Sequence, residues 1–368
     1  ADGLVHSDMT PHPAMRELAW VHRPVAVEIV GAGAARALRI TNRQSFRDLS
    51  KLRATWELVI DGASVRRGTL RVPKVAAGES IRVPLPVEAV RGSDTRLTVR
   101  WFTRVDESWA PKDHLVAWDQ VVLAKSTRRA RPAKAASGMK SIHADLLGLD
   151  PTVTLWRAAL DNDGFKNMPE IPGFGQSLRR WQQQEVDTRD AALVKHVTKR
   201  IDNKDGSLTF EHSVIVPKEL ADLPRVGVMF AIPERFTRVR WVGEGPHECY
   251  PDRRGSAVFG TWEAAPDELP YLVPQEFGLR TNCTLVELID ESRGDVLAIT
   301  SLGDPFHFSA THHTADDLFA ARDRTELQRR DHLTVHIDAA HRGLGTASCG
   351  PDTLPKYRID PGRYSLAY

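Results

Sequence analysis

The chain has 368 residues, of which 41% are hydrophobic and 27% charged, proportions that are ordinary for a soluble globular protein of two or three domains. Fifty basic and forty-eight acidic side chains give a formal net charge of +2, which is too balanced to favour nucleic acid or an anionic membrane as a partner. No apolar run approaches the ~20 residues of a membrane-spanning helix. The first residues lack both the basic region and the apolar region of a signal peptide. We therefore expect a cytoplasmic protein with a small neutral ligand, and neither nucleic acid nor membrane among its partners.

Residues 19–124 contain short segments rich in β-branched and aromatic residues, separated by Gly, Pro, Asp and Ser. About seven such segments in ~100 residues are typical of a β-sandwich. Asp61-Gly62 has the composition of a two-residue hairpin turn. The predicted strands are 25–31, 37–43, 54–62, 66–73, 80–85, 96–104 and 114–123.

Residues 125–140 are basic and rich in small side chains, which indicates an exposed linker. Arg128, Arg129 and Arg131 lie in this stretch without interleaved aromatic residues. Because bases stack on aromatic side chains in most single-strand binding sites, we interpret these arginines as solvated and not as a nucleic-acid site.

Residues 141–368 form a second run of strand-like segments, with few helical candidates. One candidate is 314–324, where Thr314 is the expected N-cap and acidic residues occupy the first turn. The run is too long for one small sandwich, so we expect a larger all-β domain. Its predicted strands are 192–201, 208–217, 225–233, 238–245, 284–290, 295–302, 333–340 and 364–368.

Irregular strings interrupt these strands. GEGPHECYPDR at 243–253 is predicted to be a loop, because Pro246 lacks a backbone donor and Gly243 and Gly245 permit turn conformations. Similar strings are ADGLVHSDMTPHPAM at 1–15, LWRAALDNDG at 155–164, PQEFGLR at 274–280 and HRGLGTASCGPDTLP at 341–355.

Together these strings resemble the carboxy-terminal part of lac-type β-galactosidases of glycoside hydrolase family 2. The resemblance implies an all-β chain, with an immunoglobulin-like β-sandwich at 19–124 followed by a large galactose-mutarotase-like β-supersandwich at 141–368. It also implies that residues 1–18 lead away from a catalytic barrel. In that family the two catalytic glutamates and the magnesium ligands lie on the barrel.

No stretch of this chain has the ~250 residues of alternating strand and helix that a barrel needs. We therefore expect no catalytic pair and no cofactor of its own in this chain. The resemblance implies hydrolysis of terminal β-D-galactosides such as lactose, with the barrel supplied as a partner and with magnesium and sodium in the complete enzyme. We also expect an oligomer.

Two residues take positions that contact the sugar in the family. Asp2 stands where the family has an asparagine beside the sugar and a sodium ion, and a carboxylate keeps an oxygen ligand for sodium. Cys349 stands near a family tryptophan that forms an acceptor-sugar platform, so the resemblance implies that this platform is lost here. The alternatives are a frayed terminus for Asp2 and a small buried residue for Cys349.

Asp161 and Asp163 are the other candidate sugar-site residues, in a loop that the resemblance brings to the mouth of the active site. We expect them to cap turns or to accept hydrogen bonds from backbone amides. A calcium loop is the alternative, although no glutamate follows at the twelfth position. Trp156 and Trp181 stack on sugars or, more commonly for large aromatic residues, fill the core.

A further alternative is an independent sugar epimerase of mutarotase type, which needs a carboxylate base and a histidine acid. Glu276 is the candidate base, and His247, His312 or His341 the candidate acid. The competing interpretation is that Glu276, Glu248, Arg253 and Arg280 form ion pairs that fix loops together. The third function class is a carbohydrate-binding or assembly module. The three cysteines, Cys249, Cys283 and Cys349, have neither zinc-site nor disulfide spacing, which indicates a reducing compartment.

Overall fold

A computed structural model of the chain describes residues 4–126, 140–141, 149–166, 176–267, 271–345 and 352–368. Its described part is all-β, as predicted, and falls into two compact units. The sandwich unit comprises 4–126 and 255–261, and the large unit comprises the remaining described residues. Most of the predicted linker, 127–139, lies outside the described residues.

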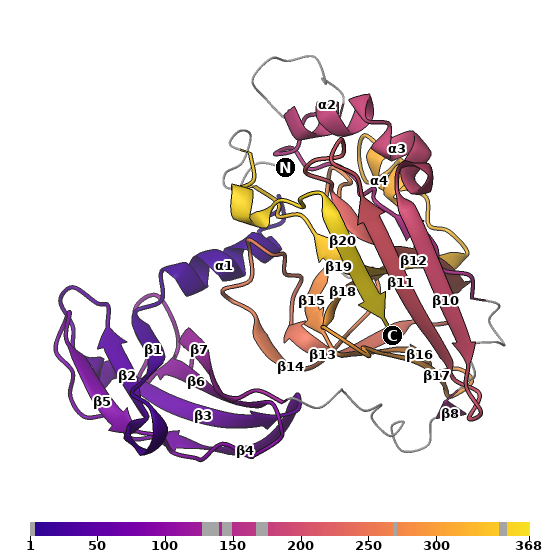
Figure 1. The fold of residues 1–368 in the computed structure, drawn as a ribbon. Coiled ribbons are helices and arrows are strands. Elements are labelled where there is room, and N and C mark those ends of the chain that lie inside the picture. The colour runs from indigo at the N-terminus through magenta and orange to yellow at the C-terminus, as the bar shows by residue number, and fades with distance from the viewer. Residues whose placement is uncertain (1–3, 127–139, 142–148, 167–175, 268–270, 346–351) are drawn as a thin grey trace. The chain divides into compact units, whose positions relative to one another are not determined.

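The sandwich unit contains the seven predicted strands, which are therefore confirmed. Two antiparallel sheets have the strand orders β1-β2-β5 and β4-β3-β6-β7 (Figure 1). The strand bounds are β1 Val25–Val30, β2 Ala37–Asn42, β3 Leu52–Ile60, β4 Ala63–Leu70, β5 Ser80–Pro84, β6 Thr95–Thr103 and β7 Leu115–Ala124.

The core of the sandwich unit lies between these sheets because alternate residues of each strand point inward. Along β7, buried Ala117, Val121 and Leu123 alternate with more exposed neighbours. The turn between β3 and β4 is also confirmed: φ is 48° at Asp61 and 84° at Gly62, the left-handed conformations that a type I′ hairpin requires.

Two features of the sandwich unit were missed by the sequence analysis. Residues Pro13–Val21 form the helix α1, which starts with proline in its first turn. Residues 255–261 return to this unit from far along the chain, and the Glu17 carboxylate accepts hydrogen bonds from the amides of Gly255 at 3.0 Å and Ser256 at 2.9 Å. Strand periodicity cannot predict these two hydrogen bonds, because both depend on the single side chain of Glu17.

Three sheets with the strand orders β10-β11-β20, β15-β18-β19-β12-β9 and β14-β13-β16-β17-β8 make up the large unit, except that residues 258–261 of β14 are counted with the sandwich unit. The eight strands predicted here are confirmed, whereas five others, β8, β9, β14, β15 and β18, were missed. The bounds are β8 Lys140–Ser141, β9 Thr152–Thr154, β10 Lys195–Asp202, β11 Leu208–Val216, β12 Arg225–Pro233, β13 Arg238–Gly245, β14 Val258–Ala264, β15 Arg280–Cys283, β16 Leu285–Asp290, β17 Asp295–Thr300, β18 Phe306–Thr311, β19 His332–His341 and β20 Gly362–Ala367.

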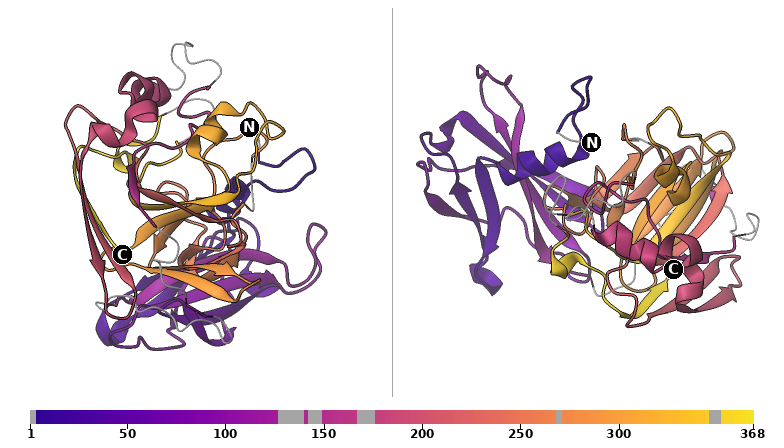
Figure 2. Two further views of the ribbon diagram at one scale, coloured as in Figure 1. Left: turned by 90° about the vertical axis from the view of Figure 1, so that its right-hand side faces the viewer. Right: turned by 90° about the horizontal axis from the view of Figure 1, so that it is seen from above.

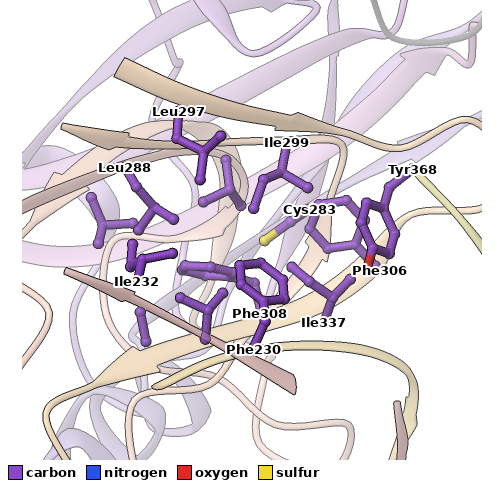
Figure 3. Close-up of a cluster of buried hydrophobic side chains, with 14 of the residues drawn as sticks. Phe230, Ile232, Cys283, Leu288, Leu297, Ile299, Phe306, Phe308, Ile337 and Tyr368 are labelled. Carbon is purple, nitrogen blue, oxygen red and sulfur yellow. The ribbon is translucent and has the colours of Figure 1, made fainter. Parts of the chain in front are cut away.

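The largest core of the protein lies between the two five-stranded sheets of the large unit (Figure 3). Phe230, Phe308 and Ile337 come from one of these sheets, and Leu288 and Ile299 from the other. All of these side chains are buried, and each removes enough apolar surface from water to contribute roughly 1.5–3 kcal/mol.

The helices of the large unit are α2 Gln176–Gln183, α3 Val186–Arg189 and α4 Ala315–Ala320, which gather at one end of the unit (Figure 2). The Thr314 N-cap is confirmed: its hydroxyl accepts from the amide of Asp317, and the Asp317 carboxylate accepts from the amide of Thr314. No described helix is long and apolar enough to cross a membrane.

The loop predicted for 243–253 starts later than expected. Strand β13 continues to Gly245, and only the following residues leave the sheet. Neither Gly243 nor Gly245 has a positive φ. Both are needed for close packing instead, because a β-carbon would lie 2.9 Å from Cys283 Sγ at Gly243 and 2.5 Å from the Trp262 ring at Gly245.

Candidate functional site

The candidate sugar-site residues fall into two groups. Asp161 and Asp163 lie in the turn that follows residues 155–160 of the large unit, where Asp161 is half-buried and Asp163 is fully buried. Asp2 and Cys349 lie outside the described residues. The described site is therefore the set of side chains that surrounds Asp163 and borders the segment 346–351.

Asp163 closes its own turn, as the sequence analysis predicted. Its Oδ2 accepts a hydrogen bond from the amide of Leu160 at 2.9 Å, and its amide donates to the carbonyl of Leu160 at 2.9 Å. The carbonyl of Asp163 accepts from the amide of Leu178 in α2 at 2.9 Å. The turn is thus fixed by its own carboxylate and is tied to α2, and no cation is required to hold it.

Two buried arginines neutralise Asp163. Arg157 Nη1 lies 2.8 Å from Oδ2, and Arg342 Nη1 lies 3.0 Å from Oδ1. Both guanidinium groups also lie over the buried ring of Trp181, 5.4 and 5.5 Å from its centroid. Trp181 and Trp156 are 0% and 5% exposed, so both tryptophans belong to the core and neither forms a sugar platform.

Arg342 is the centre of this group. Its Nε donates to Asp222 Oδ1 at 2.7 Å, its Nη1 donates to Thr353 Oγ1 at 2.8 Å, and its Nη2 donates to Ser177 Oγ at 3.0 Å and also pairs with Asp352. Burial alone would lower the pKa of Arg342, but its hydrogen bonds to Asp222 and the charge of Asp163 raise it, so the side chain stays charged. We call Arg157, Asp163, Asp222, Arg342 and Asp352 the arginine cluster.

The described residues on either side of 346–351 are held by polar contacts. Before it, the Asp252 carboxylate accepts from the amides of Leu344 and Gly345, both at 2.9 Å, and Asn162 Nδ2 donates to the carbonyl of Leu344 at 3.1 Å. Gly345 has a φ of 108°, which favours glycine. After the segment, Asp352 pairs with Arg342 of the arginine cluster and with Arg358 at 2.8 Å.

These supports were missed by the sequence analysis, whose candidate sugar-site residues were Asp2, Asp161, Asp163 and Cys349. Arg342 and Asp352 both lie within the string 341–355, one before its glycines and one after them. The sequence therefore contained a signal for these two residues. Asp222 and Asp252 lie 120 and 92 positions from their partners Arg342 and Leu344. One sequence alone gives no signal for such distant pairs.

A second polar group surrounds Glu276. Its Oε1 lies 3.5 Å from Tyr250 Oη, 3.6 Å from His341 Nε2 and 3.9 Å from Arg225 Nη2. Burial would raise the pKa of this carboxyl, but the charge of Arg225 and the neighbouring His341 lower it to about 2. Glu276 is therefore a weak base, and a weak base is a poor proton acceptor near neutral pH.

Of the candidate acids, His312 has a structural role, and Glu248 joins loops as the competing interpretation predicted. His312 pairs with Asp267, and Arg329 Nη2 lies 2.8 Å from its Nε2. Glu248 pairs with Arg253 and accepts from Tyr271 Oη at 2.9 Å. Glu248 also accepts from the amide of Gly278 at 2.8 Å, so it joins the loops 246–253 and 274–280.

The described chain is thus an all-β protein in which buried charges hold the residues on either side of 346–351. The family model "Beta galactosidase small chain" matches residues 133–368, and the model "Beta-galactosidase, domain 4" matches residues 38–124. Since the first match alone covers more than half of the chain, the chain belongs to the β-galactosidase small-chain family, and the resemblance found in the sequence is confirmed.

The matching relatives are much longer than this chain. The β-galactosidase of Arthrobacter sp. (strain B7) is 29% identical over 99% of the chain and 42% of the relative. The β-galactosidase of Klebsiella pneumoniae (strain 342) is 25% identical over 100% of the chain and 40% of the relative. Among solved structures, the exo-chitosanase of Amycolatopsis orientalis matches 81% of the chain and 29% of its own, at 12% identity and a TM-score of 0.23, too low to support an argument.

Proposed function

We propose that this chain is the domain 4 and small-chain portion of a β-galactosidase that hydrolyses terminal β-D-galactosides such as lactose, with a catalytic barrel supplied by the rest of the enzyme. The observation that carries this proposal is the coverage. The chain is matched over 99–100% of its length by β-galactosidases of which it spans 40–42%.

The geometry around 346–351 supports a role in sugar binding. A loop that contacts a substrate must be held in place before the substrate arrives, since misplacement by about 1 Å can cost roughly 100-fold in rate. The arginine cluster, Asp252 and Asn162 hold the described residues that flank this stretch, 344–345 and 352. We propose that Cys349 reaches the acceptor sugar from this loop and that Asp161, half-buried beside the anchors, faces the same site.

The metal requirements of the complete enzyme are also proposals. Asp2 is the proposed sodium ligand, and we place the magnesium site on the barrel and not on this chain. Asp163 is an unsuitable ligand for any cation, because both of its oxygens are paired with buried guanidinium groups.

We propose the cytoplasm as the compartment and an oligomer as the working state. Cys249 and Cys283 are both free and buried, which suits a reducing environment. Burial raises the pKa of the Cys249 thiol to about 11, so this residue is kept as an unreactive thiol.

The test of the proposal is whether the chain assembles with a barrel. The chain is expressed with a removable tag beside the catalytic-barrel polypeptide of the same organism, and complexes are purified through the tag and measured by analytical ultracentrifugation. We expect a stable complex that binds a galactose-configured inhibitor. A barrel polypeptide that never co-purifies, or that hydrolyses galactosides equally well without this chain, would contradict the proposal.

A further inference from the structure

The three-stranded sheet β10-β11-β20 belongs to the large unit (Figure 1). Two of its histidines lie in contact. His196 is on β10 and His212 is on β11. Thr198 is directly opposite His212 in the register, and His196 is two residues before Thr198 on the same strand. Because side chains alternate along a strand, all three share one face of the sheet.

The three side chains place three donor atoms in a nearly equilateral triangle. His196 Nε2 and His212 Nδ1 are 3.1 Å apart, and Thr198 Oγ1 is 3.0 Å from the first nitrogen and 3.1 Å from the second. The imidazole planes are nearly parallel, at 19°. His196 is half-buried and Thr198 is exposed, so the triangle can be reached from solvent, whereas His212 is 4% exposed and forms its inner wall.

The spacing of the two nitrogens suits one metal ion. With metal–nitrogen bonds of about 2.05 Å, two nitrogens lie about 2.9 Å apart at an angle of 90° and about 3.35 Å apart at the tetrahedral angle. The observed 3.1 Å falls between these limits. Imidazole nitrogens are suitable ligands for Zn²⁺, Ni²⁺ and Cu²⁺.

The second ring nitrogen of His212 has a partner of its own. Its Nε2 lies 3.3 Å from Tyr368 Oη, so an Nε2–H that donates to this oxygen leaves the lone pair on Nδ1. The ring is held between neighbours, with Phe210 at 6.0 Å and 7° and Tyr368 at 5.6 Å and 26°.

We propose that His196 and His212, with Thr198 at the third corner, bind one divalent transition-metal ion of the Zn²⁺, Ni²⁺ or Cu²⁺ class, and that water completes the coordination. The site would have two imidazole ligands. The described residues contain no group of three or more His, Cys, Asp or Glu side chains that could hold a metal. The ion joins the edge strand β10 to β11. Its binding therefore stabilises the folded chain.

The test is a calorimetric titration of the full chain, with its purification tag removed, against ZnCl₂ and NiCl₂ at pH 7.5. We expect one saturable site in the wild type and its loss in His196→Ala. The matched control is His332→Ala, which removes a partly exposed histidine at the start of β19 and should leave the site unchanged. Tyr368→Phe should weaken binding by about tenfold or more, because it removes the partner of the second ring nitrogen.

A second measurement separates loss of the ligand from loss of the fold. The melting temperature of the wild type should rise with metal concentration, as for any ligand that binds only the native state, and that of His196→Asn should not. His196→Ala and His196→Asn should both keep the wild-type circular dichroism spectrum. Equal stoichiometry and affinity in the wild type and His196→Ala, or no saturable binding in the wild type, would overturn the proposal and leave a hydrogen-bonded histidine pair only.

Discussion

Arg342 and Asp163 are 179 residues apart in the sequence, yet Arg342 Nη1 lies 3.0 Å from Asp163 Oδ1, and both side chains are at most 1% exposed. This ion pair joins the turn at 160–164 to the residue that precedes the glycine-rich string at 343–345. The two regions singled out by the sequence resemblance are therefore supported by the same buried charges.

Replacing Arg342 with methionine should destabilise the protein by about 3–5 kcal/mol, because it leaves Asp163 and Asp222 buried without their partner. The control is Lys199→Met, which removes an exposed pair with Glu211 and should cost less than about 1 kcal/mol. Urea unfolding followed by circular dichroism measures both. A loss below about 1 kcal/mol for Arg342→Met would show that the arginine cluster does not hold this region.

Asp252→Ala should affect acceptor binding more than bond cleavage in the enzyme assembled with its barrel. The variant removes two hydrogen bonds from a carboxylate to the amides of Leu344 and Gly345, each worth about 1.5–3 kcal/mol. The measurement is the ratio of galactosyl transfer to added glucose over hydrolysis, together with kcat and KM. We expect the ratio and KM to change and kcat to stay within about threefold.

For Asp252, the conservative control is Asp252→Asn, which keeps an oxygen acceptor and should retain part of the effect. If kcat falls in Asp252→Ala while the transfer ratio stays constant, Asp252 does not position an acceptor-binding loop.

The stability of Asp190→Asn relative to that of the wild type should increase as the pH rises from 4 to 7. Burial raises the pKa of Asp190 from 3.8 to about 6, although the amide of Leu155 donates a hydrogen bond to its carboxylate. The folded state thus binds the proton more tightly than the unfolded chain, and the stability gained from protonation is lost as the pH rises through 6. Between pH 4 and pH 7, the difference in unfolding free energy between Asp190→Asn and the wild type should change by about 1–3 kcal/mol.

The pH series uses the exposed Asp360→Asn as its control. A difference between wild type and Asp190→Asn that stays constant from pH 4 to 7 would rule out an elevated pKa at Asp190.

Gly227→Ala should destabilise the sheet at the irregularity between Val226 and Gly227, where β12 pairs with β19. A β-carbon at Gly227 would lie 2.1 Å from Asp338 Oδ1 and 2.7 Å from the carbonyl oxygen of Ile337, so the backbone must shift. We expect a loss of about 1–3 kcal/mol in denaturant unfolding. At Gly303 nothing lies within 4 Å of the added carbon, so Gly303→Ala should be nearly neutral. Equal stabilities of the two variants would contradict this account.

The sequence was a good guide to the strands of both units. In β7 and β11 the alternation of apolar and polar residues has the period of a strand, and buried positions alternate in the same way in the structure. Short strands such as β9, with three residues, carry too few residues for any period to be recognised. The helix α1 was missed because its residues were interpreted as a connection between domains.

The candidate site was less predictable than the fold. Asp163 was found from its position in a dense polar string, and its predicted role of accepting a backbone amide is correct. Its partner Arg342, and the pairing of Asp252 with the amides of Leu344 and Gly345, depend on contacts between residues that are far apart in the sequence. Periodicity describes only neighbouring residues, so such pairs need the three-dimensional structure.

The most direct test of the central claim is the rate of hydrolysis of a chromogenic β-galactoside by three samples: the purified chain, the barrel polypeptide of the same organism, and the two combined. If the chain completes a sugar site whose catalytic carboxylates lie on the barrel, only the combined sample should show turnover. The combined rate should fall when Arg342→Met replaces the wild-type chain. Turnover by the purified chain alone that disappears when a residue of this chain is mutated would contradict the claim.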